Sequence, residues 1–206
     1  MKIYIVRHGA VFEDGADKRF LGITDVPMTE AGRQQVMKTA ALLQNEVSAG
    51  RKMLVTSPLA RCRETAKILQ AAMPFADVQK EPLLREIDLG DWEMQTHAQI
   101  RTMFPEAYRK RGEQILTYRT PGGETFLEAG RRFREAFGRW KETAAEKDIE
   151  ELFLISHRGT VLSGLAEILG TPAEEMLAER FPYGGAIQTD RCGRVQQVFF
   201  PEGGNQ

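Results

Sequence analysis

Three apolar runs in this chain are each followed by residues that can bind or transfer a negatively charged group. These residues are Arg7 and His8 after the run at 3–6, Ser57 and Arg61 after the run at 53–56, and Ser156 and His157 after the run at 152–155. Two imidazoles and two guanidiniums in one small pocket repel one another unless an anion lies between them. A tetrahedral phosphate suits such a pocket, because a guanidinium can donate two parallel hydrogen bonds to two phosphoryl oxygens.

A neutral histidine in such a pocket can attack phosphorus and become a phosphohistidine. Neighbouring arginines stabilise the oxygens of the transition state, and they also keep the histidine unprotonated near neutral pH. The arginines supply the positive charge, so we expect neither a metal nor another cofactor. The sequence has no cluster of Asp and His at metal-ligand spacing elsewhere.

A leaving alkoxide needs a proton, and the segment LLREIDLGDWE at 83–93 offers carboxyl groups that could supply it. The candidates are Glu86, Asp88, Asp91 and Glu93. A carboxyl group beside a bound phosphate holds its proton more readily because of the like charge, which suits a general acid. After the transfer, the same group could deprotonate the water that hydrolyses the phosphohistidine. Chemistry alone leaves the choice among the four open.

The elements around these residues predict an α/β fold. Strands are expected at 3–6, 53–56, 78–80, 152–155, 186–190 and 195–200, and helices at 29–49, 59–72, 124–145 and 158–169, with short helical pieces over 95–121. Alternating strands and helices favour a mainly parallel sheet with helices on both faces. Ligands bind such sheets at the carboxyl ends of the strands, where all three apolar runs stop.

Length and composition favour a single domain over 1–206. With 28 Lys and Arg against 29 Asp and Glu, the net charge is −1, which argues against non-specific nucleic-acid binding. There are two cysteines and no CxxC pair, no signal peptide is visible at Met1, and no apolar run is long enough for a bilayer. We therefore expect a cytoplasmic protein without membrane partners. A homodimer is one open option, because the strand at 195–200 could pair between two copies at an exposed edge.

Four segments resemble the histidine phosphatase superfamily, the phosphoglycerate mutase-like group. They are VRHG at 6–9, SPLARCRETA at 57–66, REIDLGDWE at 85–93 and SHRG at 156–159, and the resemblance covers about 2–189. It implies a three-layer α/β sandwich with a mainly parallel central sheet and a small helical cap insertion. It also implies the following roles: nucleophile for His8, phosphate-pocket residues for Arg7, Arg61 and His157, and proton donor for Glu86.

The chain departs from this family after its RHG motif. Many relatives continue with Glu-Thr and an Asn, whereas Ala10 and Val11 follow here. The phosphate contact of that Asn is therefore expected from the Gly22 backbone or from Thr24. The basic stretch 95–121 lies between catalytic segments, so it forms either a cap over the pocket or a solvated helical face.

The sequence thus predicts a metal-independent phosphomonoesterase that acts through a phosphohistidine on a small phosphorylated metabolite. Similarity of the segment 18–32 to bacterial members makes alpha-ribazole 5'-phosphate one candidate substrate, by analogy only. A phosphoglycerate mutase is the alternative, although the extended WYG…LNK-type segment typical of mutases has no match after the acid. A phospholigand-binding protein that has lost catalysis is the third reading.

Overall fold

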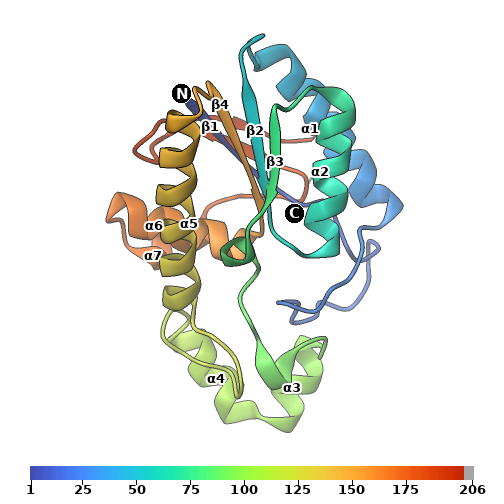
Figure 1. Ribbon diagram of the computed structural model, residues 1–206. Helices are drawn as coiled ribbons and strands as arrows, with labels where there is room; N and C mark the ends of the chain where they lie inside the picture. The colour runs from blue at the N-terminus through green and yellow to red at the C-terminus, as the bar shows by residue number, and fades with distance from the viewer. Residues whose placement is uncertain (202–206) are drawn as a thin grey trace.

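The computed structural model describes residues 1–201, and a six-stranded sheet forms its centre (Figure 1). The strands are β1 (Lys2–Arg7), β2 (Lys52–Thr56), β3 (Asp77–Lys80), β4 (Glu151–Ser156), β5 (Ala186–Thr189) and β6 (Val195–Phe199). Their order is β3-β2-β4-β1-β5-β6, with parallel pairing from β3 to β1 and antiparallel pairing of β5 and β6. The mainly parallel sheet is therefore confirmed. Residues 202–206 of the expected domain lie outside the described residues.

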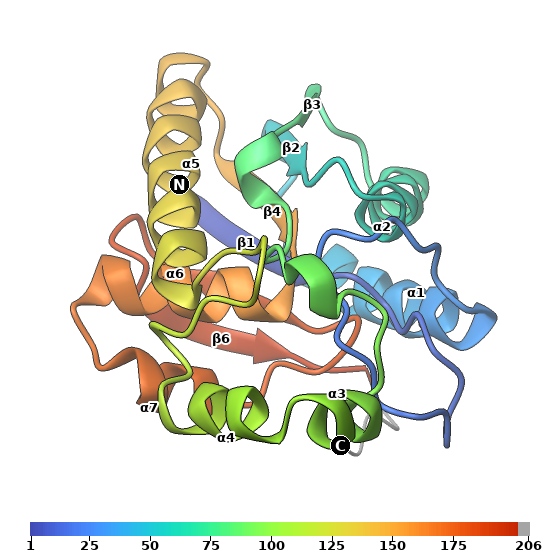
Figure 2. The ribbon, with the colours of Figure 1, turned by 90° about the horizontal axis from the view of Figure 1, so that it is seen from below.

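Helices cover both faces of this sheet. They are α1 (Glu30–Glu46), α2 (Ala60–Ala72), α3 (His97–Met103), α4 (Pro105–Glu113), α5 (Phe126–Glu146), α6 (Arg158–Leu169) and α7 (Ala173–Ala178), with two 3₁₀ turns, η1 (Pro82–Leu84) and η2 (Gly90–Trp92). Figures 1 and 2 show α1 and α2 on one face and α5 and α6 on the other. The predicted three-layer α/β sandwich is confirmed.

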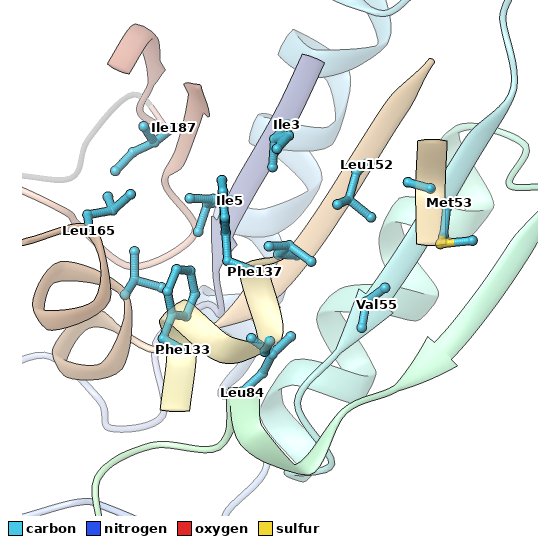
Figure 3. Close-up of a cluster of buried hydrophobic side chains, with 14 of the residues drawn as sticks. Ile3, Ile5, Met53, Val55, Leu84, Phe133, Phe137, Leu152, Leu165 and Ile187 are labelled. Carbon is cyan, nitrogen blue, oxygen red and sulfur yellow. The ribbon is translucent and has the colours of Figure 1, made fainter. Parts of the chain in front are cut away.

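Alternation along the strands divides the core into two halves. In β1, Ile3 and Ile5 pack with side chains of α5 and α6, and this cluster is drawn in Figure 3. Tyr4 and Val6, one residue out of phase, pack on the opposite face with α1 and α2. Successive side chains of a strand point to opposite faces, so a continuous apolar run signals a strand that is buried on both sides.

The helix starts follow local capping chemistry. Thr29 caps α1 by accepting a hydrogen bond from the Gly32 amide. The long helix begins at Phe126, two residues later than expected, because Thr125 and Glu128 form a capping box there. Helix α7 was not predicted. It has only six residues, and none of them is buried, so no periodic apolar pattern marks it.

Helices α3 and α4 lie beyond the carboxyl ends of the parallel strands (Figures 1 and 2). They contribute to a separate apolar cluster around Phe20, Trp92 and Ile100.

Strand β6 forms the edge of the sheet opposite β3, and its Val198 is 50% exposed. Pairing of this edge between two copies stays a prediction. None of the described helices has the length and apolar character required to cross a bilayer.

Candidate active site

The ends of β1 and β4 bring two histidines together. These strands pair in parallel with Arg7 opposite Ser156, so His8 and His157 follow at the same edge of the sheet. Their ring centroids are 5.0 Å apart, and both side chains are buried. The convergence expected from the sequence is thus present in the structure.

His8 is held as a neutral ring with one free nitrogen. Its Nδ1 lies 2.8 Å from the carbonyl oxygen of Gly9, and a carbonyl only accepts, so Nδ1 carries the proton. Burial lowers the pKa of His8 well below its ordinary value, and the charges of Arg61 and Arg7 lower it further. The Nε2 lone pair is therefore available near neutral pH, as a nucleophile requires.

Gly9 allows this strand end to approach α1. A Cβ at Gly9 would lie 2.0 Å from the carbonyl oxygen of Gly32 in the first turn of α1, closer than any side chain tolerates. The Gly9 amide donates to the sulfur of Met28 at 3.2 Å. Glycine after the histidine is thus a packing requirement, and it fixes where His8 stands.

Arg61 connects the second histidine to the loop before α1. Its Nε donates to His157 Nδ1 at 3.3 Å, while its Nη1 and Nη2 donate to the carbonyl oxygens of Thr24 and Gly22 at 2.8 and 2.6 Å. A guanidinium has five N–H groups, so two remain for a bound anion. Because Arg61 can only donate, His157 Nδ1 accepts, and its proton sits on Nε2.

Ser57 is the partner of that Nε2 proton. The Ser57 hydroxyl lies 2.9 Å from His157 Nε2 and is fully buried. Burial and the charge of Arg61 hold the pKa of His157 well below its ordinary value. The sequence places Ser57 at a strand end, but it gave no reason to pair it with His157.

Arg7 has a buried donor with no partner among the described residues. Its Nη1 donates to the Phe181 carbonyl at 2.6 Å, and its guanidinium carbon lies 3.7 Å from the centre of the Tyr183 ring. Its Nε is buried without a hydrogen bond. Burial lowers the pKa of Arg7 to about 10, which leaves it charged at neutral pH. An unsatisfied buried donor beside two histidines is suited to a phosphoryl oxygen. Sequence reasoning missed Tyr183.

Glu86 faces the start of α6, next to His157. Its Oε1 accepts from the Ile87 amide, the Thr160 amide and the Thr160 hydroxyl, at 2.9–3.0 Å. Its Oε2 accepts only one weak bond, from the Gly159 amide at 3.3 Å. The side chain is 9% exposed. Oε2 is therefore the oxygen that is able to exchange a proton with a ligand.

The other three carboxylates of this segment have structural partners or face solvent. Asp88 accepts from the Gly90 amide as a turn residue. Asp91 is exposed. Glu93 accepts hydrogen bonds from the amides of 22, 23 and 24, from the Thr24 hydroxyl and from the Leu89 amide.

Glu93 occupies the donors of Gly22 and Thr24 that were expected to contact phosphate. The Gly22 amide and both donors of Thr24 bind the Glu93 carboxylate, and the carbonyls of both residues hold Arg61. A direct contact of either residue with phosphate stays a prediction, and it would require Glu93 to release them. In this structure the loop acts on the pocket through Arg61.

Cys62 is a buried structural cysteine. Its side chain is fully buried in the core cluster of α1 and α2, and its thiol lies 3.4 Å from His157 Nε2. Burial raises the pKa of Cys62 to about 12, so the thiol is protonated at neutral pH. Its place beside Arg61 therefore does not make Cys62 a reactive thiol of lowered pKa.

Arg111 of α4 lies near an aromatic ring that approaches Glu86. A Cβ at Gly159 would lie 3.0 Å from both Phe126 Cε1 and Glu86 Oε1, so the Phe126 ring and the Glu86 carboxylate border the same glycine. The Arg111 guanidinium carbon lies 5.9 Å from the centre of that ring and 5.1 Å from the centre of Phe20. Phe20 also stacks on His97, which is half-buried.

Within residues 1–201, no three His, Cys, Asp or Glu side chains are grouped so that they could hold a metal ion. The positive groups that face the two histidines are arginines.

Known proteins resemble this chain over most of its length. A probable phosphoglycerate mutase GpmB from Yersinia pestis is 31% identical over 176 residues, covering 84% of this chain and 77% of that protein. The structure of an alpha-ribazole phosphatase from Shigella flexneri superposes with a TM-score of 0.77 at 26% identity, covering 92% and 90% of the two chains. A mycobacterial glucosyl-3-phosphoglycerate phosphatase superposes with a TM-score of 0.77 at 25% identity, covering 91% and 88%. The model of the histidine phosphatase superfamily (branch 1) matches residues 3–192, and with the paired histidines this places the chain in that superfamily.

Proposed function

We propose that this protein hydrolyses a small phosphomonoester through a phosphohistidine on His8, without a metal. The observation that carries the proposal is the neutral His8 ring, whose Nδ1 proton is bound to Gly9 and whose Nε2 is free beside two arginines. Membership of the superfamily supports the hydrolase class.

The proposed chemistry has two steps. In the first, His8 Nε2 attacks phosphorus, the bond from phosphorus to the ester oxygen breaks, and Glu86 Oε2 gives its proton to the leaving oxygen. Arg7 and Arg61 stabilise the charge on the phosphoryl oxygens. In the second, the Glu86 carboxylate takes a proton from water, the oxygen of that water attacks phosphorus, and phosphate leaves with His8 restored.

Trapping the intermediate tests this proposal. Wild-type protein incubated with ³²P-labelled phosphomonoester and quenched in alkali is expected to carry acid-labile label on the peptide that contains His8. The His8→Asn variant should carry none and should not hydrolyse p-nitrophenyl phosphate, whereas His97→Asn, a matched change outside the site, should behave as wild type. Label on another residue, or full activity in His8→Asn, would contradict the proposal. Loss of activity with EDTA, restored by a divalent metal, would contradict its metal-free form.

We further propose that the stretch 95–121 caps the pocket and selects substrates with a second negative group. Helix α4 supplies Arg111, for which the described residues provide no carboxylate partner, and its guanidinium lies near the rings of Phe20 and Phe126. The neighbouring Arg109 instead pairs with Glu106 and Glu113 at the surface. The stretch 95–121 therefore has a solvent-exposed face, which carries Arg109, and one inward-facing arginine, Arg111.

A substrate panel separates the options. 3-phosphoglycerate and glucosyl-3-phosphoglycerate carry a carboxylate, whereas p-nitrophenyl phosphate and alpha-ribazole 5'-phosphate have no such group. Arg111→Met is expected to raise KM at least tenfold for the first two and less than threefold for the others, and Arg109→Met should change neither. Equal effects on both groups would contradict the role of Arg111. A preference of the wild type for alpha-ribazole 5'-phosphate would instead favour the nucleoside-type substrate.

Phosphoglycerate mutase activity remains the second candidate, because of the relative named for it. Interconversion of 3- and 2-phosphoglycerate faster than release of inorganic phosphate would establish it. A phospholigand-binding protein without catalysis would show neither reaction, and it would bind vanadate without turning over any ester.

A further inference from the structure

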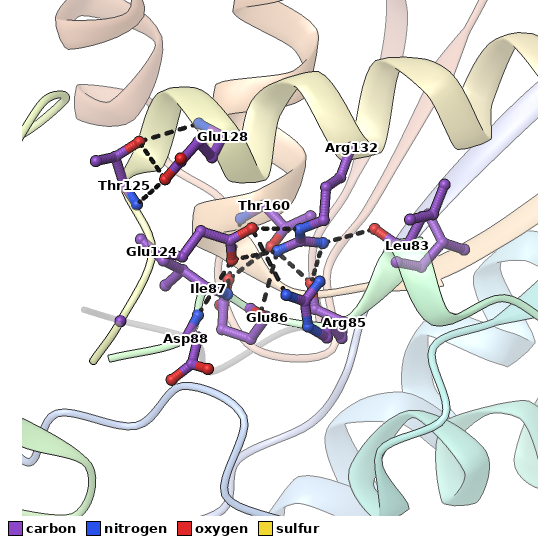
Figure 4. A network of polar contacts seen from close by, with 12 residues as sticks. Leu83, Arg85, Glu86, Ile87, Asp88, Glu124, Thr125, Glu128, Arg132 and Thr160 are labelled. Atoms are coloured by element: carbon purple, nitrogen blue, oxygen red, sulfur yellow. Dashed lines mark hydrogen bonds and ion pairs between the residues drawn. The ribbon is translucent and has the colours of Figure 1, made fainter. Parts of the chain in front are cut away.

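Next to the segment that carries Glu86, a largely buried ion pair has no part in the proposed chemistry (Figure 4). Arg132 of α5 donates from Nε and Nη2 to the two carboxylate oxygens of Glu124, at 2.7 and 2.9 Å. Both side chains are only 12% exposed. A two-point pairing of this kind fixes the orientation of the guanidinium as well as its position.

The remaining donors of Arg132 all bind the backbone of the segment that carries the acid. Its Nη1 donates to the carbonyl oxygens of Leu83 and Arg85 at 2.7 and 3.0 Å, and its Nη2 donates to the Glu86 carbonyl at 3.3 Å. All five N–H groups of Arg132 are therefore used.

Glu124 binds the same segment on the other side of Glu86. Its Oε2 accepts from the Asp88 amide at 3.2 Å, and its own amide donates to the Asp88 carbonyl at 2.8 Å. Arg132 and Glu124 together thus hold the chain at 83, 85, 86 and 88. Between η1 and η2 this segment belongs to no helix or strand, so no ladder of backbone hydrogen bonds fixes it.

The acid is consequently held at two places. Thr160 and Gly159 bind its carboxylate, while Arg132 and Glu124 fix the backbone from which the side chain extends. Proton transfer needs a donor within about 2.6–3.2 Å of the oxygen that receives the proton. Displacement of a catalytic group by about 1 Å can slow a reaction a hundredfold.

We propose that Arg132 and Glu124 are positioning residues for the proton donor Glu86. This proposal rests on the proposed function, because it takes Glu86 as the acid. Lysine cannot replace Arg132, since a single ammonium has three donors and no planar fork for Glu124.

Dependence on the leaving group tests the pair. Aryl and alkyl phosphates of graded leaving-group pKa are compared, because p-nitrophenolate leaves with little help whereas an alkoxide needs a proton. Glu86→Gln is expected to lower kcat/KM, which reports the first step, about 10²–10³-fold for an alkyl phosphate and less than tenfold for p-nitrophenyl phosphate. Arg132→Ala, Arg132→Lys and Glu124→Gln should show the same pattern, and adding Arg132→Ala to Glu86→Gln should cause little further loss.

A matched control and a rescue distinguish positioning from a general loss of structure. Arg134, on the same helix, pairs with Glu167 at the surface, so Arg134→Ala should leave the leaving-group dependence unchanged. A cavity of about 710 Å³, lined by Arg85, Glu124 and Arg132 among others, opens beside the pair. Millimolar guanidinium should therefore reach the space left in Arg132→Ala and restore alkyl phosphate hydrolysis several-fold.

Equal losses of kcat/KM for aryl and alkyl esters, no loss in any variant, or a full multiplicative loss in the double variant would overturn the inference. If Arg132→Ala does not fold, Arg132→Lys and Glu124→Gln decide by the same measurement. Failure of the proposed function would look different, because the wild type itself would then hydrolyse neither class of ester.

Discussion

Replacing Glu93 by glutamine tests how the loop 22–24 contributes to the pocket. The carboxylate accepts five hydrogen bonds, with three donors at Oε2 and two at Oε1. Glutamine turns one of these oxygens into an NH₂ group, which cannot accept. The orientation that loses fewest hydrogen bonds places the NH₂ group at the position of Oε1. The hydrogen bonds from the Ile23 and Leu89 amides are then lost, and these two donors face another donor.

The magnitude follows from these contacts. Hydrogen bonds to a charged acceptor contribute about 1.5–3 kcal/mol each, so two losses destabilise this region by about 3–6 kcal/mol. The three bonds that remain lose their charge assistance. Because the carbonyls of Gly22 and Thr24 hold Arg61, we also expect weaker binding of vanadate, by about tenfold or more.

Urea denaturation and vanadate inhibition measure the two effects. Asp91→Asn, the same change at an exposed position of η2, should alter neither. Tighter vanadate binding in Glu93→Gln would refute the reasoning, since it would mean that the freed Gly22 and Thr24 donors contact the anion directly. An unchanged unfolding free energy would refute the hydrogen-bond account.

Three further outcomes follow from the site. The unfolding free energy should fall as pH drops below about 6.5, because a buried neutral histidine must gain a proton on unfolding. The unfolded histidine is only half to about nine-tenths protonated over pH 5.5–6.5, so the curve for His8→Gln should be flatter by about 1 kcal/mol over that range, and an equal slope would contradict the buried neutral ring. Gly9→Ala should destabilise the protein by about 1–3 kcal/mol in thermal melts, because its Cβ would overlap α1, whereas Gly112→Ala meets no atom and should not. Ser57→Ala should lower kcat/KM about tenfold by releasing His157 Nε2, and unchanged kinetics would show that the hydroxyl does not orient that ring.

The paired histidines could be predicted from the sequence because strand topology alone brings them together. Parallel strands end at one edge of a sheet, and the apolar runs before His8 and His157 are long enough to be recognised as buried strands. Arg61 follows from its place just after the start of α2. The positions of these three side chains therefore depend on regular elements that a sequence displays.

The choice among four carboxylates could not be made in the same way. Glu86 and Glu93 lie in one irregular segment, and both are acceptors of several amides. Which of them reaches the pocket is decided by the path of the backbone, and no periodic pattern encodes that path. The resemblance to a family named Glu86, and the contact with Thr160 supplies the physical reason.

Arg132 shows why a positioning residue is the hardest to find. On the sequence it is one arginine among several in a long amphipathic helix, 46 positions after the acid. It binds three backbone carbonyl oxygens, and every residue type has such an oxygen. The residue types at 83, 85 and 86 therefore do not indicate in the sequence that an arginine binds there. Side chains that do chemistry can be recognised by their type, whereas side chains that hold irregular backbone can be recognised only by what they touch. The structure therefore adds most where the chain is least regular, and in this protein that is the segment between η1 and η2.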